Sequence, residues 1–71
     1  MKFEIIEVAL ANGDFVSHDV EANGPVEAMA NLFDEVDSEM IKYLEKNIKN
    51  VRENEWKDKG EEFLYIIRLV K

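Results

Sequence analysis

Ser17, His18 and Asp19 are consecutive residues of the three types that serve in nucleophilic catalysis. A nucleophilic dyad needs the serine hydroxyl within hydrogen-bonding reach of the imidazole. The flanking residues are typical of a β-strand, where consecutive side chains point to opposite faces of the sheet. We therefore expect His18 to be an ordinary strand histidine and Ser17 to lie beyond its reach.

His18 is also the only histidine, and a metal site built on one imidazole needs converging carboxylates. Glu7 could face it across a hairpin, but neither residue has a metal-ligand spacing such as H-E-x-x-H. The three glycines are isolated, so a phosphate-binding loop is not predicted. Because threonine, glutamine and cysteine are absent too, we predict no catalytic residue, no metal and no cofactor.

Lys42, Lys46 and Lys49 recur at intervals of four and three residues, which would place them on one side of a helix. Such a ridge could contact the phosphates of a nucleic acid. Three lysines release few phosphate counterions and so contribute little affinity, and the acidic remainder of the chain repels the phosphate backbone. We therefore favour a solvated helix face and keep direct nucleic-acid binding as the weaker interpretation.

The densest cluster of acidic residues in the chain comprises Asp34, Glu35, Asp37 and Glu39. At the carboxyl end of a helix, Asp34 and Glu35 would each cost about 0.3–1 kcal/mol against the helix dipole. In a continuous helix, Glu35 and Glu39 would repel each other one turn apart. Since the run is unfavourable in both geometries, we interpret these four acids as a candidate partner-binding surface, with solubility as the alternative explanation.

Charge is unevenly distributed along the chain, whose net charge is −7. Residues 1–39 hold ten acids and one base, whereas residues 40–71 hold six acids and eight bases. This asymmetry indicates a basic protein partner, for example a nucleic-acid-binding protein, rather than DNA. The amino-terminal segment is unlike a signal peptide, and no apolar run is long enough to span a bilayer, so we expect a cytoplasmic protein without membrane contact.

A β-hairpin is predicted at the start of the chain, because residues 2–11 are rich in strand-forming types and Asn12-Gly13 follows as a turn. A two-residue turn would place Glu7 opposite His18. A three-residue loop would instead gather Ile6, Val8, Leu10, Val16 and Val20 on one face, with His18 among them. A slip by one residue exchanges the buried and exposed faces, so both registers remain open.

Residues 24–51 carry an apolar stripe at helical spacing, and Pro25 suits the first turn of a helix. One unbroken helix would be about 41 Å long, whereas a compact chain of this length is about 29 Å across. We therefore predict a break near Asp37 and Ser38, either of which can cap a second helix. A continuous helix is the alternative if the overhang packs in a dimer.

The last element, residues 63–70, is apolar at most positions and is predicted to be a central strand that pairs with the first. Residues 51–57 fit an edge strand, followed by a turn at residues 58–60, or an extension of the helix capped by Gly60. The chain is thus predicted to be one small domain over residues 1–71. Its fold class is α+β: an antiparallel sheet of three or four strands with one broken helix or two helices on one face, in the order ββα(α)(β)β.

No stretch of the sequence resembles a known family, so the functional hypotheses rest on the distribution of charge. The leading hypothesis is a non-enzymatic interaction module, an acidic accessory or inhibitor protein that docks on a basic partner, in a sharper form by imitating nucleic-acid phosphates. The alternative is a self-associating structural or scaffolding protein, since a small cysteine-free core gains stability from a homodimer. The third hypothesis is a weak nucleic-acid binder that acts through the lysine ridge.

Overall fold

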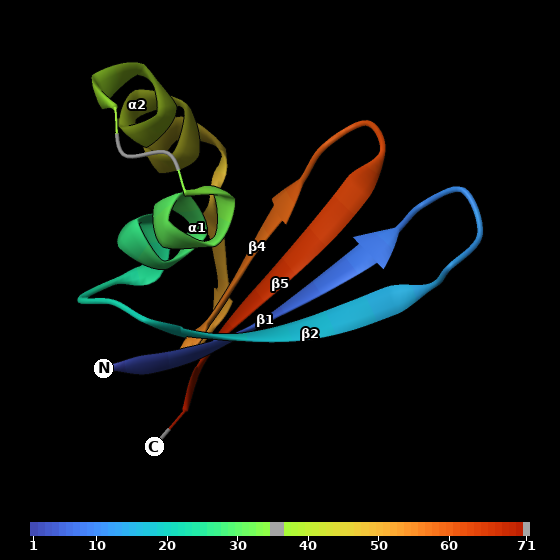
Figure 1. Cartoon of the computed structure of the whole chain (residues 1–71), viewed down its shortest axis with the longest axis horizontal. Coiled ribbons are helices and arrows are strands. Elements are labelled where there is room, and N and C mark those ends of the chain that lie inside the picture. The colour runs from blue at the N-terminus through green and yellow to red at the C-terminus, as the bar shows by residue number, and fades with distance from the viewer. Residues whose placement is uncertain (35–36, 71) are drawn as a thin grey trace.

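The computed structural model of the chain describes residues 1–34 and 37–70. Within these ranges, five strands and two helices follow each other in the order ββααβββ. They are β1 (Lys2–Ala9), β2 (Phe15–Glu21), α1 (Pro25–Phe33), α2 (Ser38–Asn47), β3 (Lys49–Arg52), β4 (Glu55–Lys59) and β5 (Phe63–Val70). The strands form one antiparallel sheet in the order β2-β1-β5-β4-β3, and both helices lie on the same face of it (Figure 1).

The predicted α+β class, the two helices on one face and the pairing of the last strand with the first are confirmed. The number of strands is five instead of three or four, because residues 49–59 form a hairpin rather than a single strand. Asn54 has a φ of 62° in the turn of this hairpin. Asparagine tolerates this left-handed conformation better than most residues, which allows the tight turn between β3 and β4.

The β1–β2 hairpin has a four-residue loop, so both predicted registers were wrong. The amide of Ala9 donates to the carbonyl oxygen of Asp14 at 2.8 Å, and the amide of Gly13 donates to the carbonyl oxygen of Ala9 at 2.8 Å. Gly13 has a φ of 78°, a conformation that favours glycine. The Asn12 Oδ1 atom accepts a hydrogen bond from the Asp14 amide at 3.0 Å, which widens the loop as an Asx turn.

This register decides which side chains face the helices. His18 lies opposite Ile5, and Val20 lies opposite Phe3. Ile5 also lies opposite Ile67 of β5. The face that includes these residues packs against the helices, and its centre is the core of the protein. The buried apolar residues of that core are Phe3, Ile5, Ala22, Ala28, Met29, Ala30, Leu44 and Ile67.

The break between the helices lies where the length argument predicted it. Pro25 occupies the first turn of α1, and Asp34 ends this helix in the left-handed conformation with a φ of 58°. Asp37 caps α2, because its Oδ1 atom accepts a hydrogen bond from the Met40 amide at 2.8 Å. The apolar stripe was expected to continue α1 through Val36, which lies outside the described residues.

No helix in the described part of the chain is both long and apolar enough to cross a membrane.

The cap of α2 gives a testable contribution to stability. Replacing Asp37 by alanine removes the acceptor of the Met40 amide, and we expect the free energy of unfolding to fall by about 1 kcal/mol. Asp37→Asn keeps an acceptor oxygen without the charge and should remain within a few tenths of a kcal/mol of wild type. Urea unfolding of the three proteins measures this, and an equal loss in both variants would contradict the capping role.

Candidate functional site

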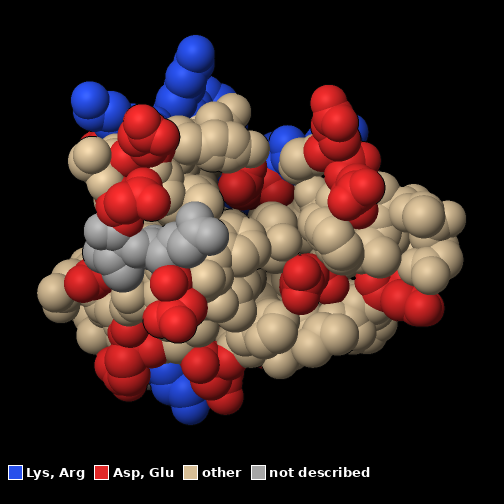
Figure 2. Space-filling view, turned by 45° about the horizontal axis from the view of Figure 1, so that its top comes forward, with Lys and Arg blue, Asp and Glu red and all other residues tan. Residues whose placement is uncertain are grey.

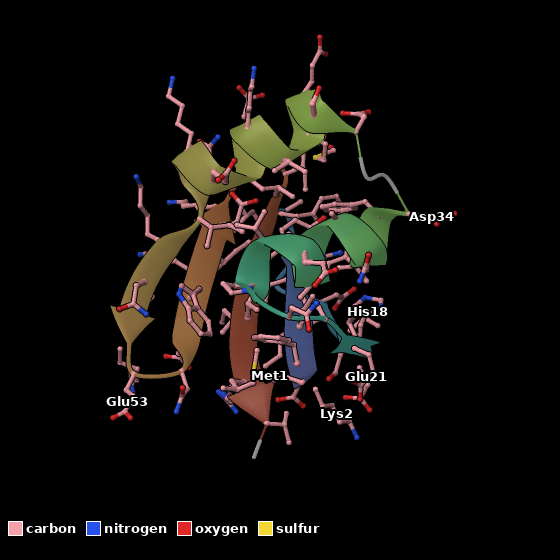
Figure 3. All side chains as sticks on the ribbon, turned by 90° about the vertical axis from the view of Figure 1, so that its left-hand side faces the viewer. Met1, Lys2, His18, Glu21, Asp34 and Glu53 are labelled. Carbon is pink, nitrogen blue, oxygen red and sulfur yellow. The ribbon has the colours of Figure 1, made fainter. Side chains whose placement is uncertain are left out.

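The predicted acidic surface lies at the junction of the two helices. Asp34, Asp37 and Glu39 are all exposed there, while Glu35 lies outside the described residues. Figure 3 shows Asp34 at the outer end of α1. Asp37 is engaged as the helix cap, and Glu39 stands in the first turn of α2, where it is favourable to the dipole. The unfavourable interaction predicted for acids at the carboxyl end of α1 is therefore partly offset, because Asp37 and Glu39 lie at the amino end of α2.

These acids are not neutralised by basic side chains of the described residues. The ion pairs among the described residues join residues of the strands or the amino terminus, as in Arg52–Glu55 at 2.9 Å and Arg68–Glu4 at 3.6 Å. None of them includes an acid of α1, of α2 or of the described residues between them. Figure 2 shows the resulting groups of acidic side chains around the helical layer. The helix junction thus presents uncompensated negative charge.

An apolar pocket of about 490 Å³ opens beside this junction, between the helices and the sheet. Its walls include aromatic and aliphatic side chains of both helices and β5, and its polar lining is acidic. The lining residues are Phe33, Asp37, Glu39, Met40, Tyr43, Leu44, Asp58, Gly60 and Tyr65. We call this the acidic–aromatic pocket. It includes two of the predicted surface residues, Asp37 and Glu39, but not Asp34.

Asp58 is the distinctive residue of the acidic–aromatic pocket. Its side chain lies on the helix-facing side of β4 and is only 5% exposed. Its Oδ1 atom is buried and has no hydrogen-bond partner among the described residues. Desolvation of the charged form raises the pKa of the Asp58 carboxyl above its ordinary value of 3.8. A buried carboxylate without a partner is costly, which makes Asp58 a candidate for ligand contact.

Tyr65 forms another wall and belongs to a short polar chain that leads away from the pocket. Its hydroxyl donates to Glu7 Oε2 at 3.2 Å, and Glu7 Oε1 lies 3.1 Å from His18 Nε2. Burial, together with the Glu7 carboxylate, raises the pKa of Tyr65 to about 12, so its phenol stays neutral at physiological pH. The rings of Phe33 and Tyr65 pack edge-to-face with their centroids 5.3 Å apart, and together they form the aromatic wall of the pocket.

The other candidates are also placed by the structure. Ser17 and His18 lie on opposite faces of β2, and the Ser17 hydroxyl donates to Glu4 Oε2 at 3.2 Å, so the two do not form a dyad. The Glu7–His18 contact forms along a diagonal rather than between opposite residues, because Glu7 lies opposite Val16. No group of three metal-ligating side chains is found within residues 1–34 and 37–70.

The lysine ridge is shorter than predicted. Lys42 and Lys46 are exposed on α2, which ends at Asn47. Lys49 belongs to β3, and its ammonium donates to the carbonyl oxygen of Lys46 at 3.1 Å. Only two lysines therefore remain on the helix surface, and the third is engaged at its carboxyl end, where it complements the dipole.

Sequence reasoning missed Asp58, which it had assigned to a turn with Lys59 and Gly60. Asp58 instead lies within β4, opposite Tyr65, and the turn begins after Lys59. A signal was present in the alternation of the strand, because Trp56 and Asp58 stand two residues apart and must share a face. The aromatic lining drawn from α1, α2 and β5 could not be anticipated without the tertiary arrangement.

Comparisons of the chain with protein-family models, with curated proteins and with solved structures found no match.

Burial of the Asp58 charge predicts a pH-dependent stability difference. Because its pKa is raised in the folded state, ionisation of Asp58 destabilises the fold above pH 3.8, and this penalty vanishes at lower pH, where the carboxyl is protonated in both states. Asp58→Asn should therefore raise the free energy of unfolding at pH 7 by on the order of 1 kcal/mol.

Urea unfolding of wild type and Asp58→Asn measures this difference. The pH should range from about 7 to about 3, which covers both sides of the ordinary aspartate pKa. The other titratable groups that line the pocket, Asp37, Glu39 and Tyr65, are common to both proteins, so the difference isolates Asp58. A variant that is less stable at neutral pH, or a difference that does not change with pH, would contradict the desolvation of this carboxylate.

Proposed function

We propose that this protein is a non-enzymatic interaction module, an acidic accessory or inhibitor protein that docks on a basic protein partner. The observation that carries the proposal is the uncompensated charge of the helix junction. Asp34, Asp37 and Glu39 are exposed and have no ion-pair partner among the described residues, whereas several acids of the sheet do. Charge left unpaired beside an apolar pocket suits a surface that is neutralised on docking.

A basic partner would be attracted over long distances by the net charge of −7 and oriented by the helix junction. The apolar pocket beside the acids supplies what charge alone does not, since apolar burial contributes affinity while complementary charge mainly speeds and orients association. A partner that itself binds nucleic acid is a natural candidate, because its phosphate-binding surface is already basic. In that case docking would block the surface, and the protein would act as an inhibitor.

Recovery of basic partners on immobilised protein tests this proposal. We expect neutralisation of the run, by Asp34→Asn, Glu35→Gln, Asp37→Asn and Glu39→Gln together, to reduce recovery about tenfold or more. Recovery by wild type should also fall steeply between about 0.1 M and 1 M salt, as the screening length drops from roughly 10 Å to 3 Å.

A matched control changes the same number of charges elsewhere, with Asp14→Asn, Glu53→Gln, Glu61→Gln and Glu62→Gln. All four of these residues are exposed and lie in hairpin turns. Equal recovery by wild type and the helix-junction variant, or recovery that persists unchanged in high salt, would refute docking by this acidic surface.

Self-association is the second candidate function, and it is favoured by the sheet face that lies away from the helices. Ile6 and Val8 of β1 stand there beside Ile66 and Leu64 of β5, all of them half-buried. Phe15 of β2, opposite Val8, is 71% exposed. An apolar face of this kind is suited to the packing of a second sheet about 10 Å away.

Charge on this open face is compatible with a second copy of the same chain. Glu4 and Arg68 lie opposite each other on β1 and β5. A two-fold axis parallel to these strands and between them would place Ile6 over Ile66 and Glu4 over Arg68 of the other copy. The same axis would place Asp19 of β2 over Glu55 of β4. The surface would thus be apolar at its centre and mixed in charge at its end, with the complementary pair in the middle of that row.

Sedimentation equilibrium tests the open face. Wild type should form a dimer at concentrations of about 0.1 mM or below, whereas Ile66→Lys should sediment as a monomer, since one lysine per copy would be buried in the apolar interface. Tyr43→Lys is the control, because Tyr43 is 47% exposed on α2, on the other side of the sheet. A wild-type protein that remains monomeric at high micromolar concentration excludes this function.

A further inference from the structure

The acidic–aromatic pocket combines two features that one ligand chemistry would satisfy together. Its walls are apolar, from Phe33, Met40 and Leu44 to the rings of Tyr43 and Tyr65. Its carboxylates stand at two depths: those of Asp37 and Glu39 are exposed, and that of Asp58 is buried. A long apolar stem that ends in a positive charge would match the walls with its stem and the inner carboxylate with its tip.

The burial of the Asp58 carboxyl is an observation independent of the exposed acids, and it marks a strong acceptor inside the pocket. Its Oδ1 atom has no hydrogen-bond partner among the described residues, and no ion pair there includes Asp58. Buried polar atoms in folded proteins are nearly always paired. Asp58 lines the acidic–aromatic pocket, so a cation that enters the pocket would approach this carboxylate. Such a cation would offset the desolvation of the Asp58 charge.

We propose that the acidic–aromatic pocket binds the side chain of a lysine from the basic partner. This inference rests on the proposed function and identifies the anchor of the docking surface. The methylene stem would lie against Met40 and Leu44, and the ammonium would approach Asp58 past the faces of Tyr43 and Tyr65, which attract cations. Asp37 and Glu39 at the surface would guide the ammonium inward.

Lysine fits the pocket better than arginine because its charge is compact and lies at the end of an apolar stem. A guanidinium donates as a flat fork to two oxygens, whereas an ammonium is a compact charge that a single oxygen can accept. Asp58 is the buried carboxylate of the pocket lining, and Asp37 already accepts a hydrogen bond from the Met40 amide. The inner end of the pocket therefore offers one carboxylate below apolar walls, which suits a point charge on a methylene stem.

Titration of the full chain with n-butylammonium, followed by NMR, tests the pocket without the partner. We expect saturable chemical-shift changes at Tyr43, Leu44 and Tyr65. Binding should weaken about tenfold or more in Asp58→Asn, and n-butanol, the uncharged analogue, should bind wild type about tenfold more weakly than the ammonium does. Asp14→Asn is the matched control, since it removes one exposed acid in the β1–β2 loop, outside the pocket lining, and should change the affinity less than about twofold.

Three results would overturn the lysine pocket. Equal affinity of wild type and Asp58→Asn for butylammonium would show that the inner carboxylate does not bind the cation. Equal affinity for butanol would show that the pocket selects apolar stems alone. Binding of n-butylguanidinium about tenfold tighter than butylammonium would assign the pocket to arginine instead.

The pocket and the proposed function can fail separately. If Asp58→Asn retains the basic partner while neutralisation of the helix junction releases it, the lysine anchor is wrong and docking by the acidic surface stands. If neutralisation of the helix junction leaves partner recovery unchanged, the proposed function is wrong, and the lysine anchor falls with it.

Discussion

Two helices of nine and ten residues have to cover one face of a five-stranded sheet. At 1.5 Å per residue they are about 14 and 15 Å long, while five strands at about 4.8 Å spacing span roughly 19 Å. α1 packs against β1, β2 and β5, and α2 packs against β4. The cover is therefore incomplete, and the hairpins extend beyond the helices (Figure 1). The acidic–aromatic pocket lies at the margin of the helical layer. The apolar face lies on the other side of the sheet, which neither helix covers.

The large elements could be predicted because each rests on one dominant physical term. The β1–β5 pairing follows from two apolar segments of equal type, and the helix break follows from the mismatch between helix length and domain size. The hairpin registers could not be predicted, because they depend on loop hydrogen bonds such as that from the Asp14 amide to Asn12. The fifth strand was missed for a similar reason, since the left-handed turn at Asn54 gives only a weak signal in sequence.

The candidate site was predicted in part. Asp37 and Glu39 line the pocket as members of the acidic run, but the run was chosen for its charge and not for its neighbours. Asp58 is separated from Glu39 by 19 positions in the sequence, and only the packing of α2 over β4 brings the two residues to one cavity. Local patterns report which residues are acidic, whereas desolvation of a carboxylate is a property of the tertiary structure.

The burial of Asp58 sets this residue apart from the exposed acids of the helix junction. Exposed acids such as Asp34 increase solubility at little cost, so their presence alone does not indicate a partner. A carboxylate that is 5% exposed and lacks a hydrogen bond lowers stability, and a cation would reverse that effect. If the proposed lysine anchor is right, the same residue would link the stability of a small domain to the chemistry of its partner.

The ionisation of Asp58 is measured most directly by NMR titration of its side-chain carboxyl carbon, with and without saturating n-butylammonium. In the free protein we expect a pKa above the ordinary 3.8, because burial disfavours the charged form. With butylammonium bound, we expect the pKa of Asp58 to fall, because an adjacent cation favours the carboxylate. A pKa at or below 3.8 in the free protein, or one that butylammonium leaves unchanged, would contradict a desolvated carboxylate that binds a cation.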